Sequence, residues 1–356
     1  MSRGESPSIK IDGRRIGPGE PVFIVAEMSA NHHGRYEDAL RILEAAREAG
    51  ADAVKIQTYT PDTMTFPDDR PMFRAGKGTL WAGRNLYDLY REAATPWDWQ
   101  PKLIDAAAKI GLTLFSTPFD ETAVEFLEGM RVPAYKIASF ELVDLPLIQR
   151  AARTGKPIIL STGMATLAEI KEAVGAAKKA GAGGIVLLKC TSAYPAPLAE
   201  MNLRAIPRLA RIFKVPVGLS DHTLEWTAPA AAVALGACLI EKHFTLSRDV
   251  PGPDSAFSLE PREFKAMVGN IRDVEKALGS ADFSVGEQEG KSRQFRRSLF
   301  VVKDVKKGER YSPENVRSLR PADGLAPKFL PNVLGRRAAR DIRAGTPLSR
   351  DMWGHS

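Results

Sequence analysis

Two histidines lie at the ends of successive apolar runs in the second half of the chain. His222 follows VPVGLSD at residues 215–221, and His243 lies in CLIEKHF at residues 238–244. If these runs are neighbouring strands, both imidazoles reach the same edge of a sheet. There they could hold a divalent metal together with carboxylate, water or substrate oxygens; two hydrogen-bonded histidines without a metal are the alternative. Strand alternation puts Lys242 on the face opposite His243.

Three lysines also interrupt apolar runs. They are Lys55 in AVKIQ, Lys136 in AYKIAS and Lys189 in IVLLKCT. A lysine among core strand residues is unfavourable unless an anion meets it. Because alternate strands of a barrel contribute to one interior layer, we expect these ammonium groups to converge on a phosphate or carboxylate. Pairing with neighbouring acidic residues is the competing interpretation.

The elements that would position these groups are eight short strand-like runs, which alternate with helix-like segments from Pro21 to about Leu278. This alternation predicts βαβ units and a parallel sheet, and eight units of this length are typical of a closed (β/α)8 TIM barrel of the α/β class. A doubly wound open sheet is the runner-up, although the first turn, AEMSANHHG, is not a glycine-rich dinucleotide loop. The expected strands cover residues 22–27, 53–57, 113–117, 134–139, 157–163, 185–191, 215–221 and 238–244.

Polar side chains end nearly all of these runs. In a TIM barrel, catalytic groups project from the carboxyl ends of the strands, so this pattern predicts a polar chamber at one end of the barrel. The residues concerned are Glu27, Thr117, Ser139, Ser161, Thr191, Ser192, Asp221, His222 and His243.

Local signals mark other elements. The connection from residue 58 to about residue 94 is rich in aromatic residues, and its length predicts a lid or substrate wall, with NLYDLYREA as a helix packed on the barrel as the alternative. Thr166 and Glu169 have the spacing of a capping box, and Gly181 is expected to end the same helix.

Composition narrows the class of protein. The net charge of +7 is scattered over the 356 residues without a recognisable nucleic-acid module, which favours small anionic substrates over nucleic acid. No apolar run approaches the roughly 18 residues of a membrane span. The polar start MSRGESPSIK is unlike a secretory leader, so we expect a cytoplasmic protein without a membrane partner. Cys190 and Cys238 are expected to be reduced core thiols without a chemical role.

The last part of the chain predicts a separate module. Residues 279–297 (GSADFSVGEQEGKSRQFRR) are polar and aperiodic, as in a linker, between a catalytic domain at residues 1–278 and a small domain at residues 298–356. A domain of about 60 residues is only marginally stable by itself, so this module is expected to pack against a larger partner.

Taken in order, the motifs resemble the sialic acid synthase family over almost the entire chain. They are AEMSANHHG at 26–34, KIQTYTPDTMT at 55–65, STPFD at 116–120, YKIASFE at 135–141, STGMAT at 161–166, KCTSAYPAP at 189–197, GLSDHT at 218–223, EKHFT at 241–245 and RPADG at 320–324. Within the family, AEMSANH, QTYTPDT, GTLWAGRNLYDLY at 78–90 and GLAPKF at 324–329 are most similar to the branch that makes pseudaminic acid.

The resemblance implies a TIM barrel followed by a small antifreeze-like (SAF) domain, in a homodimer whose SAF domains are swapped so that each caps its partner's barrel. It also implies condensation of phosphoenolpyruvate with 2,4-diacetamido-2,4,6-trideoxy-altrose and water, giving pseudaminic acid and phosphate. The implied cofactor is a divalent metal, usually Mn²⁺, with Mg²⁺ or Co²⁺ as alternatives. The alternative products are N-acetylneuraminic or legionaminic acid, made from N-acetylmannosamine or a diacetamido mannose derivative.

Family roles carry over position by position. His222 and His243 would hold the metal, and Glu27 would be the catalytic carboxylate. The positions that match phosphoenolpyruvate-binding residues are Lys55, Thr117, Lys136, Ser139, Ser161 and Ser220. The positions that match sugar-binding residues are Glu141, Tyr194, Glu241, Asp254, Phe295 and Arg320. Packing or surface roles are the alternatives for Tyr194, Phe295 and Arg320, and Ser192 replaces an asparagine of some relatives.

Two other functions are compatible with the residues alone. One is an aldolase or isomerase that forms a Schiff base with a buried lysine, which borohydride would trap. The other is a sugar-binding module, which would release no phosphate from phosphoenolpyruvate.

Overall fold

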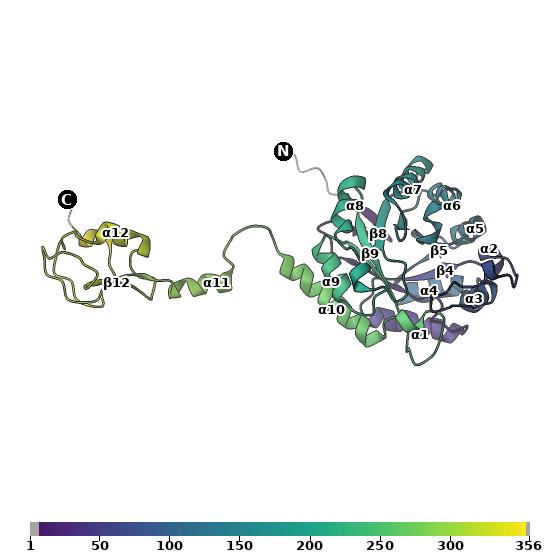
Figure 1. Cartoon of the computed structure of the whole chain (residues 1–356), viewed down its shortest axis with the longest axis horizontal. Coiled ribbons are helices and arrows are strands. Elements are labelled where there is room, and N and C mark those ends of the chain that lie inside the picture. The colour runs from purple at the N-terminus through teal and green to yellow at the C-terminus, as the bar shows by residue number, and fades with distance from the viewer. Residues whose placement is uncertain (1–6, 354–356) are drawn as a thin grey trace. The chain divides into compact units, whose positions relative to one another are not determined.

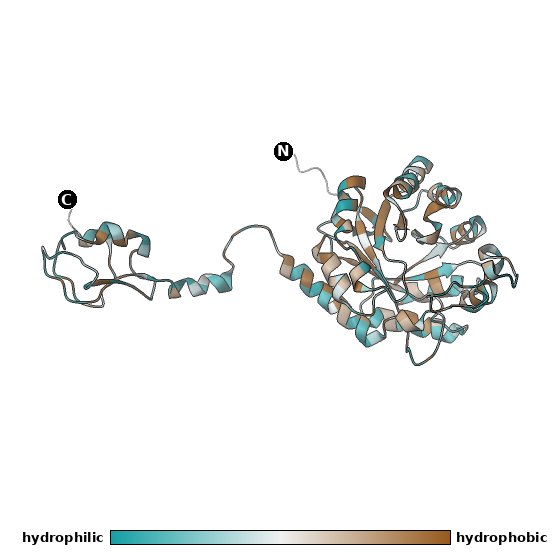
Figure 2. Ribbon diagram, in the orientation of Figure 1, coloured by the Kyte–Doolittle hydropathy of each residue, from teal (hydrophilic) through white to brown (hydrophobic). Residues whose placement is uncertain are grey.

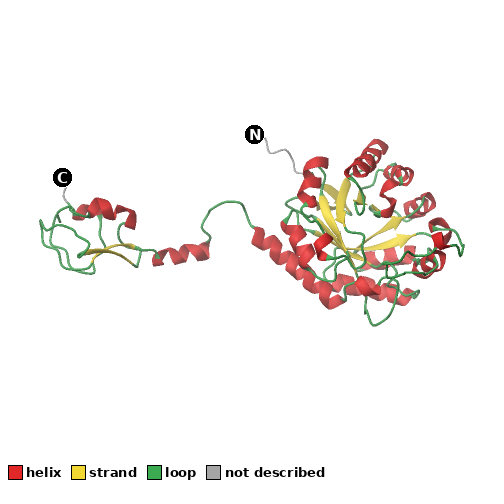
Figure 3. Cartoon of the chain, viewed as in Figure 1, coloured by secondary structure: helices red, strands yellow, loops and turns green. Residues whose placement is uncertain are grey.

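The computed structural model describes residues 7–353 and divides into two compact units, Met1–Gly279 and Ser280–Ser356. In the first unit, eight parallel strands form a closed barrel in the order β10-β3-β4-β5-β6-β7-β8-β9 (Figure 3). This confirms the predicted TIM barrel, and the open sheet is wrong. The strands are β3 (Phe23–Glu27), β4 (Ala53–Thr58), β5 (Thr113–Pro118), β6 (Tyr135–Ile137), β7 (Ile158–Ser161), β8 (Ile185–Cys190), β9 (Val217–Asp221) and β10 (Leu239–His243).

Helices surround the barrel (Figure 1). They are α1 (Tyr36–Glu48), α4 (Gln100–Lys109), α5 (Glu121–Gly129), α6 (Leu145–Ala152), α7 (Leu167–Ala180), α8 (Ala205–Phe213), α9 (Thr227–Ala234) and α10 (Pro261–Leu278). α7 begins with the predicted capping box, in which Thr166 and Glu169 bond each other's backbone N–H, and it ends at Gly181, whose φ of 95° lies in the left-handed region. Apolar residues are concentrated in the strands and alternate with polar residues along the helices (Figure 2).

The barrel interior changes from apolar to polar along its axis. The inward positions near the amino ends of the strands, among them Phe23, Phe115, Ile159 and Leu239, form one apolar cluster. A short hairpin that the sequence analysis did not predict, β1 (Ile9–Ile11) and β2 (Arg14–Ile16), packs its isoleucines into the same cluster. Within the described residues, this hairpin therefore covers the apolar amino end of the barrel.

The second unit has a small core of its own. It contains α11 (Glu287–Lys291), an antiparallel pair of strands β11 (Ser298–Val301) and β12 (Val316–Leu319), and α12 (Leu330–Val333). Leu299, Val301, Tyr311, Val316 and Leu348 are among its buried residues. Over residues 7–353, no helix has the length and apolarity needed to cross a bilayer.

Candidate active site

A polar layer lies directly above the apolar floor of the barrel. Because side chains alternate between the two faces of a strand, each strand continues its inward-facing set into this layer. The inward positions at or next to the carboxyl ends are Glu27, Lys55, Gln57, Thr117, Lys136, Ser161, Cys190, Ser220, Glu241 and His243. The predicted polar chamber at this end of the barrel is therefore present.

The two histidines lie side by side. His222 follows β9, His243 ends the neighbouring β10, and their ring centroids are 5.3 Å apart. Nδ1 of His222 is 3.0 Å from the carbonyl oxygen of Thr191, so this nitrogen donates and leaves Nε2 free as a ligand. Nδ1 of His243 is buried and has no hydrogen-bond partner in the described part of the chain. Both rings therefore have nitrogen lone pairs available for a ligand.

Two of the three lysines converge beside the histidines and are fully buried. Nζ of Lys55 lies 2.7 Å from Oε2 of Glu27 and 3.4 Å from Oε1 of Glu241. Nζ of Lys136 lies 3.5 Å from the same Oε1 of Glu241. These two lysines therefore converge as predicted, and neighbouring carboxylates neutralise them there, as the competing interpretation expected; their binding of a phosphate or carboxylate ligand stays a prediction.

The pKa values in this cluster reflect burial and close charges. Burial opposes ionisation of Glu241, but Lys136, Lys55 and the hydroxyl of Ser220 outweigh it and lower the Glu241 pKa to about 2. Burial raises the pKa of Glu27, against the opposing effect of Lys55. Burial also lowers the Lys136 pKa despite the nearby Glu241. Lys136 is thus the cation of the cluster that gains most from an additional anion.

The third lysine does not join this cluster, and the expectation of three converging lysines is wrong for Lys189. Val186 and Leu188 face the barrel interior, so alternation turns Lys189 outward, where Nζ donates to the carbonyl of Cys190 at 2.6 Å. Lys242 also faces outward, as predicted, and pairs there with Asp221.

The same alternation corrects the expectation for Cys190. Its thiol points into the polar layer, with Sγ 4.0 Å from Nδ1 of His222 and 3.8 Å from Oγ of Ser192. Burial raises its pKa, but His222, Ser139 and Lys136 outweigh burial and lower the pKa to about 7. Cys238 is a buried core thiol, as expected.

The predicted hydroxyl groups lie at the same carboxyl end of the barrel as the lysines. Thr117 accepts a hydrogen bond from Nζ of Lys55 at 3.2 Å, and Ser220 donates to Oε1 of Glu241 at 3.0 Å. Oγ of Ser139 accepts from the backbone N–H of Gly163 at 3.1 Å. Among the residues described, buried Oγ of Ser161 has no partner.

Gly163 was not singled out from the sequence, although it lies in the STGMAT motif. A Cβ at this position would lie 2.7 Å from Oγ of Ser139 and 2.2 Å from Oγ of Ser192. The residue therefore has to be glycine for the two hydroxyls to stay where they are.

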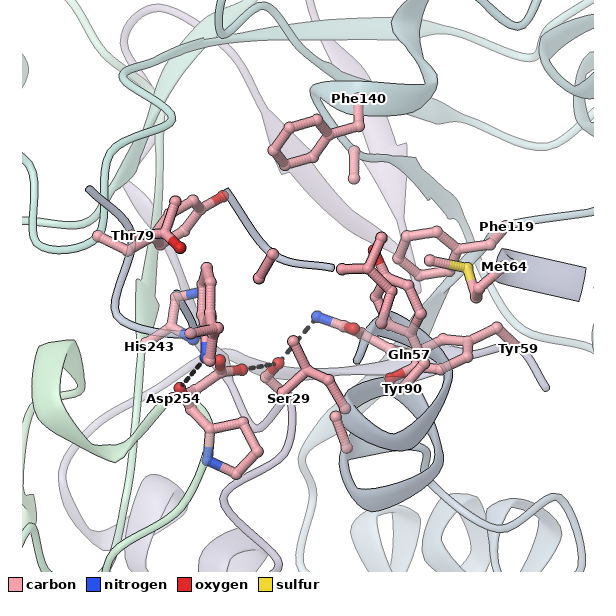
Figure 4. A pocket seen from close by; sticks show the side chains of 18 of the residues that line it. Ser29, Gln57, Tyr59, Met64, Thr79, Tyr90, Phe119, Phe140, His243 and Asp254 are labelled. Atoms are coloured by element: carbon pink, nitrogen blue, oxygen red, sulfur yellow. Dashed lines mark hydrogen bonds between the residues drawn. The ribbon is translucent and has the colours of Figure 1, made fainter. Parts of the chain in front are cut away.

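A cavity of about 460 Å³ opens beside His243. One side of it is a hydrogen-bonded chain, in which Ser29 donates to Asp254 and Gln57 donates to Oγ of Ser29 at 2.9 Å (Figure 4). Gln57 also donates to Oε1 of Glu27 at 3.3 Å. Ser29 and Gln57 were missed, although Gln57 occupies an inward position of a strand that the sequence had located and Ser29 lies two residues beyond the end of β3.

The remaining predicted sugar-site residues divide between the two units. Glu141, Tyr194 and Asp254 line the cavity, and the Tyr194 ring centroid is 4.3 Å from that of His222. Burial raises the Glu141 pKa to about 7, and its Oε2 has no partner within residues 7–353. Phe295 and Arg320 lie in the second unit with exposed side chains, and their role at a sugar site stays a prediction.

The long connection after β4 forms the opposite side of the cavity and contains the helix expected at NLYDLYREA, while its role as a lid or substrate wall stays a prediction. Its helices are α2 (Pro61–Met64) and α3 (Leu86–Ala93). Trp81 anchors it across the barrel mouth, because Nε1 donates to the carbonyl of Pro253 at 2.8 Å and the indole packs against Tyr194.

The residues present fit a metal ion that keeps open coordination positions. In the described part of the chain, no group of three or more His, Cys, Asp or Glu side chains is arranged to hold an ion. Two histidines with free nitrogens would therefore need oxygens of water or substrate to complete the shell. Oε2 of Glu241 and Oγ of Ser161 are buried and have no hydrogen-bond partner in residues 7–353, as expected of groups that face a ligand.

Comparisons with known proteins agree with this architecture. The sequence profile of the NeuB family matches residues 42–283, and that of the SAF domain matches residues 296–352. The chain is 47% identical to a pseudaminic acid synthase of Helicobacter pylori over 93% of its length and 98% of the relative. It is 48% identical to a pseudaminic acid synthase of Campylobacter jejuni over 92% of its length and 96% of the relative.

Solved structures agree as well. An N-acetylneuraminic acid synthetase of Leptospira borgpetersenii, crystallised with citrate, superposes with a TM-score of 0.73 at 32% identity. The match covers 81% of this chain and 95% of that one.

Proposed function

The chain belongs to the NeuB family, and from that membership we propose that it condenses phosphoenolpyruvate with 2,4-diacetamido-2,4,6-trideoxy-altrose and water, giving pseudaminic acid and phosphate. The reaction is of the transferase type. The observation that carries the proposal is the position of the histidine pair at the carboxyl end of the barrel, next to a buried cluster of two lysines and two carboxylates and, through His243, next to the cavity. The lower identity to an N-acetylneuraminic acid synthetase makes that activity the less supported alternative, together with legionaminic acid synthesis.

Phosphoenolpyruvate is assigned to the lysine cluster. Its carboxylate and phosphate would be held by Lys55 and Lys136, with Thr117, Ser139, Ser161 and Ser220 as hydroxyl partners. Each hydrogen bond between a charged group and its partner contributes on the order of 1.5–3 kcal/mol. The low pKa of Glu241 and the lowered pKa of Lys136 support this assignment. Glu241 is the carboxylate that pairs with Lys136, and an incoming anion would give this lysine a second negatively charged partner.

The sugar is assigned to the cavity beside His243. Its hydroxyl and acetamido groups would meet Glu141, Tyr194 and Asp254, which line that cavity. In this arrangement the aldehyde end lies next to the two histidines and the enol carbon of phosphoenolpyruvate. Holding both reactants in one closed-off place lowers the entropic cost of forming the new carbon–carbon bond.

A divalent metal, with Mn²⁺ preferred and Mg²⁺ or Co²⁺ as alternatives, would be held by His222 and His243. When bound, it would polarise the aldehyde oxygen and make the carbonyl carbon a better electrophile. The free ring nitrogens of both histidines support this assignment.

Glu27 is assigned the proton transfer that follows bond formation. Once the vinyl carbon has attacked the aldehyde, the former enol carbon is electron-poor and must add water before phosphate leaves. The raised pKa of Glu27 suits a general base for that water, and contacts from Ser29 and Gln57 to Oε1 fix its orientation. Lys55 beside Oε2 stabilises the carboxylate until the proton arrives.

We further propose a homodimer in which each SAF domain caps the barrel of its partner, with Arg320 and Phe295 reaching the partner's sugar. An apolar rim supports the proposal. Large exposed hydrophobic residues follow five of the barrel strands at the carboxyl end, and without a partner on this face they would remain in contact with water. They are Phe140, Val143, Met164, Leu167, Leu198, Leu224, Trp226 and Val250. A cytoplasmic location is proposed as well, since two free buried cysteines are typical of a reducing compartment.

Identification of the product tests the proposed function. The protein would be incubated with phosphoenolpyruvate, Mn²⁺ and either the altrose derivative, its manno isomer or N-acetylmannosamine, and the nine-carbon acid identified by mass and NMR. We expect pseudaminic acid from the altrose derivative as the most rapidly formed product. A preference for either of the other sugars would replace the proposal with legionaminic or N-acetylneuraminic acid synthesis.

A further inference from the structure

The side of the cavity formed by residues 58–94 differs in chemistry from the side that carries the hydrogen-bonded chain. The cavity-lining residues of this connection are Tyr59, Met64, Ala75, Gly76, Thr79, Trp81, Leu86, Leu89, Tyr90 and Ala93. None of them is charged, and hydroxyl groups occur only on Tyr59, Thr79 and Tyr90. Phe119 and Phe140, from other connections, extend the apolar surface.

The connection itself is rich in charge, but its charges pair with one another away from the cavity. Arg70 pairs with Asp68, Arg74 with Asp69, Arg84 with Glu92 and Arg91 with Asp88. All of residues 58–94 are described, and none of the charged ones lines the cavity. The segment therefore presents an uncharged face to the ligand and a charged face to water.

The cavity that would hold the sugar is unsuited to an anionic group. Its lining includes the carboxylates Glu141 and Asp254, whereas no lysine or arginine of residues 7–353 lines it. Lys55 and Lys136 belong to the separate cluster that the proposed function assigns to phosphoenolpyruvate. A phosphate on the sugar would thus face carboxylates and apolar groups without a cation to balance it.

The direction of the sugar follows from the positions of these groups. Figure 4 shows Met64, Phe119 and Tyr59 on the side of the cavity opposite His243. If the aldehyde end lies beside the histidines, as the proposed function has it, the far end of the sugar chain points toward Met64. α2, which ends at Met64, contacts α3, which supplies Leu86, Leu89 and Ala93 to the same surface.

We propose that Met64 and Leu86, on this apolar face, are specificity-determining residues that select an unphosphorylated sugar whose far end is a methyl group. The inference rests on the proposed function for the orientation of the sugar. A hydroxyl at the far end would lose its water and gain no partner from either side chain. An apolar pocket discriminates against an added hydroxyl by about 100-fold at most. We therefore expect a preference of about 10-fold to 100-fold for the 6-deoxy sugar over its 6-hydroxy analogue.

The test compares kcat/KM for three sugars: the 6-deoxy altrose derivative, the same diacetamido sugar with a 6-hydroxyl, and N-acetylmannosamine 6-phosphate. The wild type should prefer the first by about tenfold or more and should not use the phosphate. Met64→Gln and Leu86→Gln should each reduce this preference severalfold, while KM for phosphoenolpyruvate stays unchanged. Met64→Leu should restore it, and Met72→Gln is the matched control, because Met72 is exposed on the same connection and does not line the cavity.

The outcomes separate this inference from the proposed function. Equal use of the 6-deoxy and 6-hydroxy sugars by the wild type, or an unchanged preference in both glutamine variants, would overturn the role of the apolar face while leaving the condensation intact. Turnover of the phosphorylated sugar would overturn it as well. Preference for the manno isomer in the product assay of the proposed function would instead replace the proposed product and leave the apolar face with its role. If a glutamine variant does not fold, the wild-type sugar panel still decides the matter.

Discussion

Glu241 is the residue whose removal tests the buried charge cluster most sharply. Its Oε1 lies 3.5 Å from Nζ of Lys136 and 3.4 Å from Nζ of Lys55. Lys55 keeps Glu27 as a second partner at 2.7 Å, whereas Glu241 is the only carboxylate of residues 7–353 within ion-pair distance of Lys136. Glu241→Gln preserves the shape of the side chain and leaves Lys136 buried without an anion.

Breaking a buried ion pair by removing one partner costs about 3–5 kcal/mol. For a domain of this size, 1 kcal/mol corresponds to about 2–4 °C in the melting midpoint, so we expect the variant to melt roughly 10 °C lower than the wild type. Phosphoenolpyruvate should restore much of this loss, because its anionic groups replace the missing carboxylate. The ligand-induced rise in midpoint should therefore be larger in the variant than in the wild type at the same concentration.

Scanning calorimetry of both proteins, with and without phosphoenolpyruvate, measures these quantities. Glu172→Gln on the exposed face of α7 is the matched control and should change the midpoint little, since surface substitutions are usually within about 0.5 kcal/mol. A Glu241→Gln midpoint equal to that of the control would refute the ion-pair reasoning. A ligand-induced rise smaller than in the wild type would refute the assignment of phosphoenolpyruvate to these lysines.

Further predictions concern single groups of the site. Glu27→Gln should lower turnover at least roughly 100-fold while phosphoenolpyruvate still binds in calorimetric titration, and near-normal turnover would exclude Glu27 as the base. Gly163→Ala should weaken phosphoenolpyruvate binding by about tenfold or more, because its methyl displaces two serine hydroxyls; an unchanged KM would contradict the assignment. The folded-state pKa of Glu141 is raised by burial from 4.5 to about 7, so its contribution to stability is fully present below pH 4.5 and is lost as the pH rises through about 7. The wild-type melting midpoint should accordingly fall relative to that of Glu141→Gln over this range, and parallel curves would argue against the shift. Mixed dimers of Arg320→Ala and His222→Ala subunits should regain activity if Arg320 acts on the partner's barrel, whereas inactive hybrids of confirmed composition would contradict the swap.

The barrel could be predicted from sequence because each of its strands is a compact apolar run between helical segments. The hairpin of residues 9–16 was not predictable in the same way. Its strands, IKI and RRI, are three residues long and rich in basic side chains, so neither shows a period that local sequence can reveal. Their isoleucines are buried because they pack against the apolar cluster at the amino end of the barrel.

The inward set of β10 could be assigned from sequence, because Glu241 and His243 share one face and Lys242 lies on the other. In β8 the assignment failed. The run IVLL is apolar on both faces, as expected for a strand buried on both sides. The local sequence therefore does not tell which set of alternate residues faces the barrel interior. Lys189 was therefore expected inside, although the structure turns Lys189 outward and the Cys190 thiol inward.

The uncharged face of residues 58–94 could not be predicted for a different reason. The sequence shows many charges in this connection, and which side faces the cavity depends on contacts made far along the chain. The hydrogen bond from Trp81 to Pro253 joins residues separated by 172 positions. Such contacts are set by the closed barrel and are not visible in local patterns.

Phosphate release by metal-depleted protein tests the central claim most directly, because it needs both substrates and the metal in one site. The assay would compare phosphoenolpyruvate alone, phosphoenolpyruvate with the altrose derivative, and each mixture with Mn²⁺ restored. We predict rapid release only when sugar and metal are both present, and its loss in His222→Ala and His243→Ala. Equal release without sugar or without metal, or full activity of either histidine variant, would contradict the account.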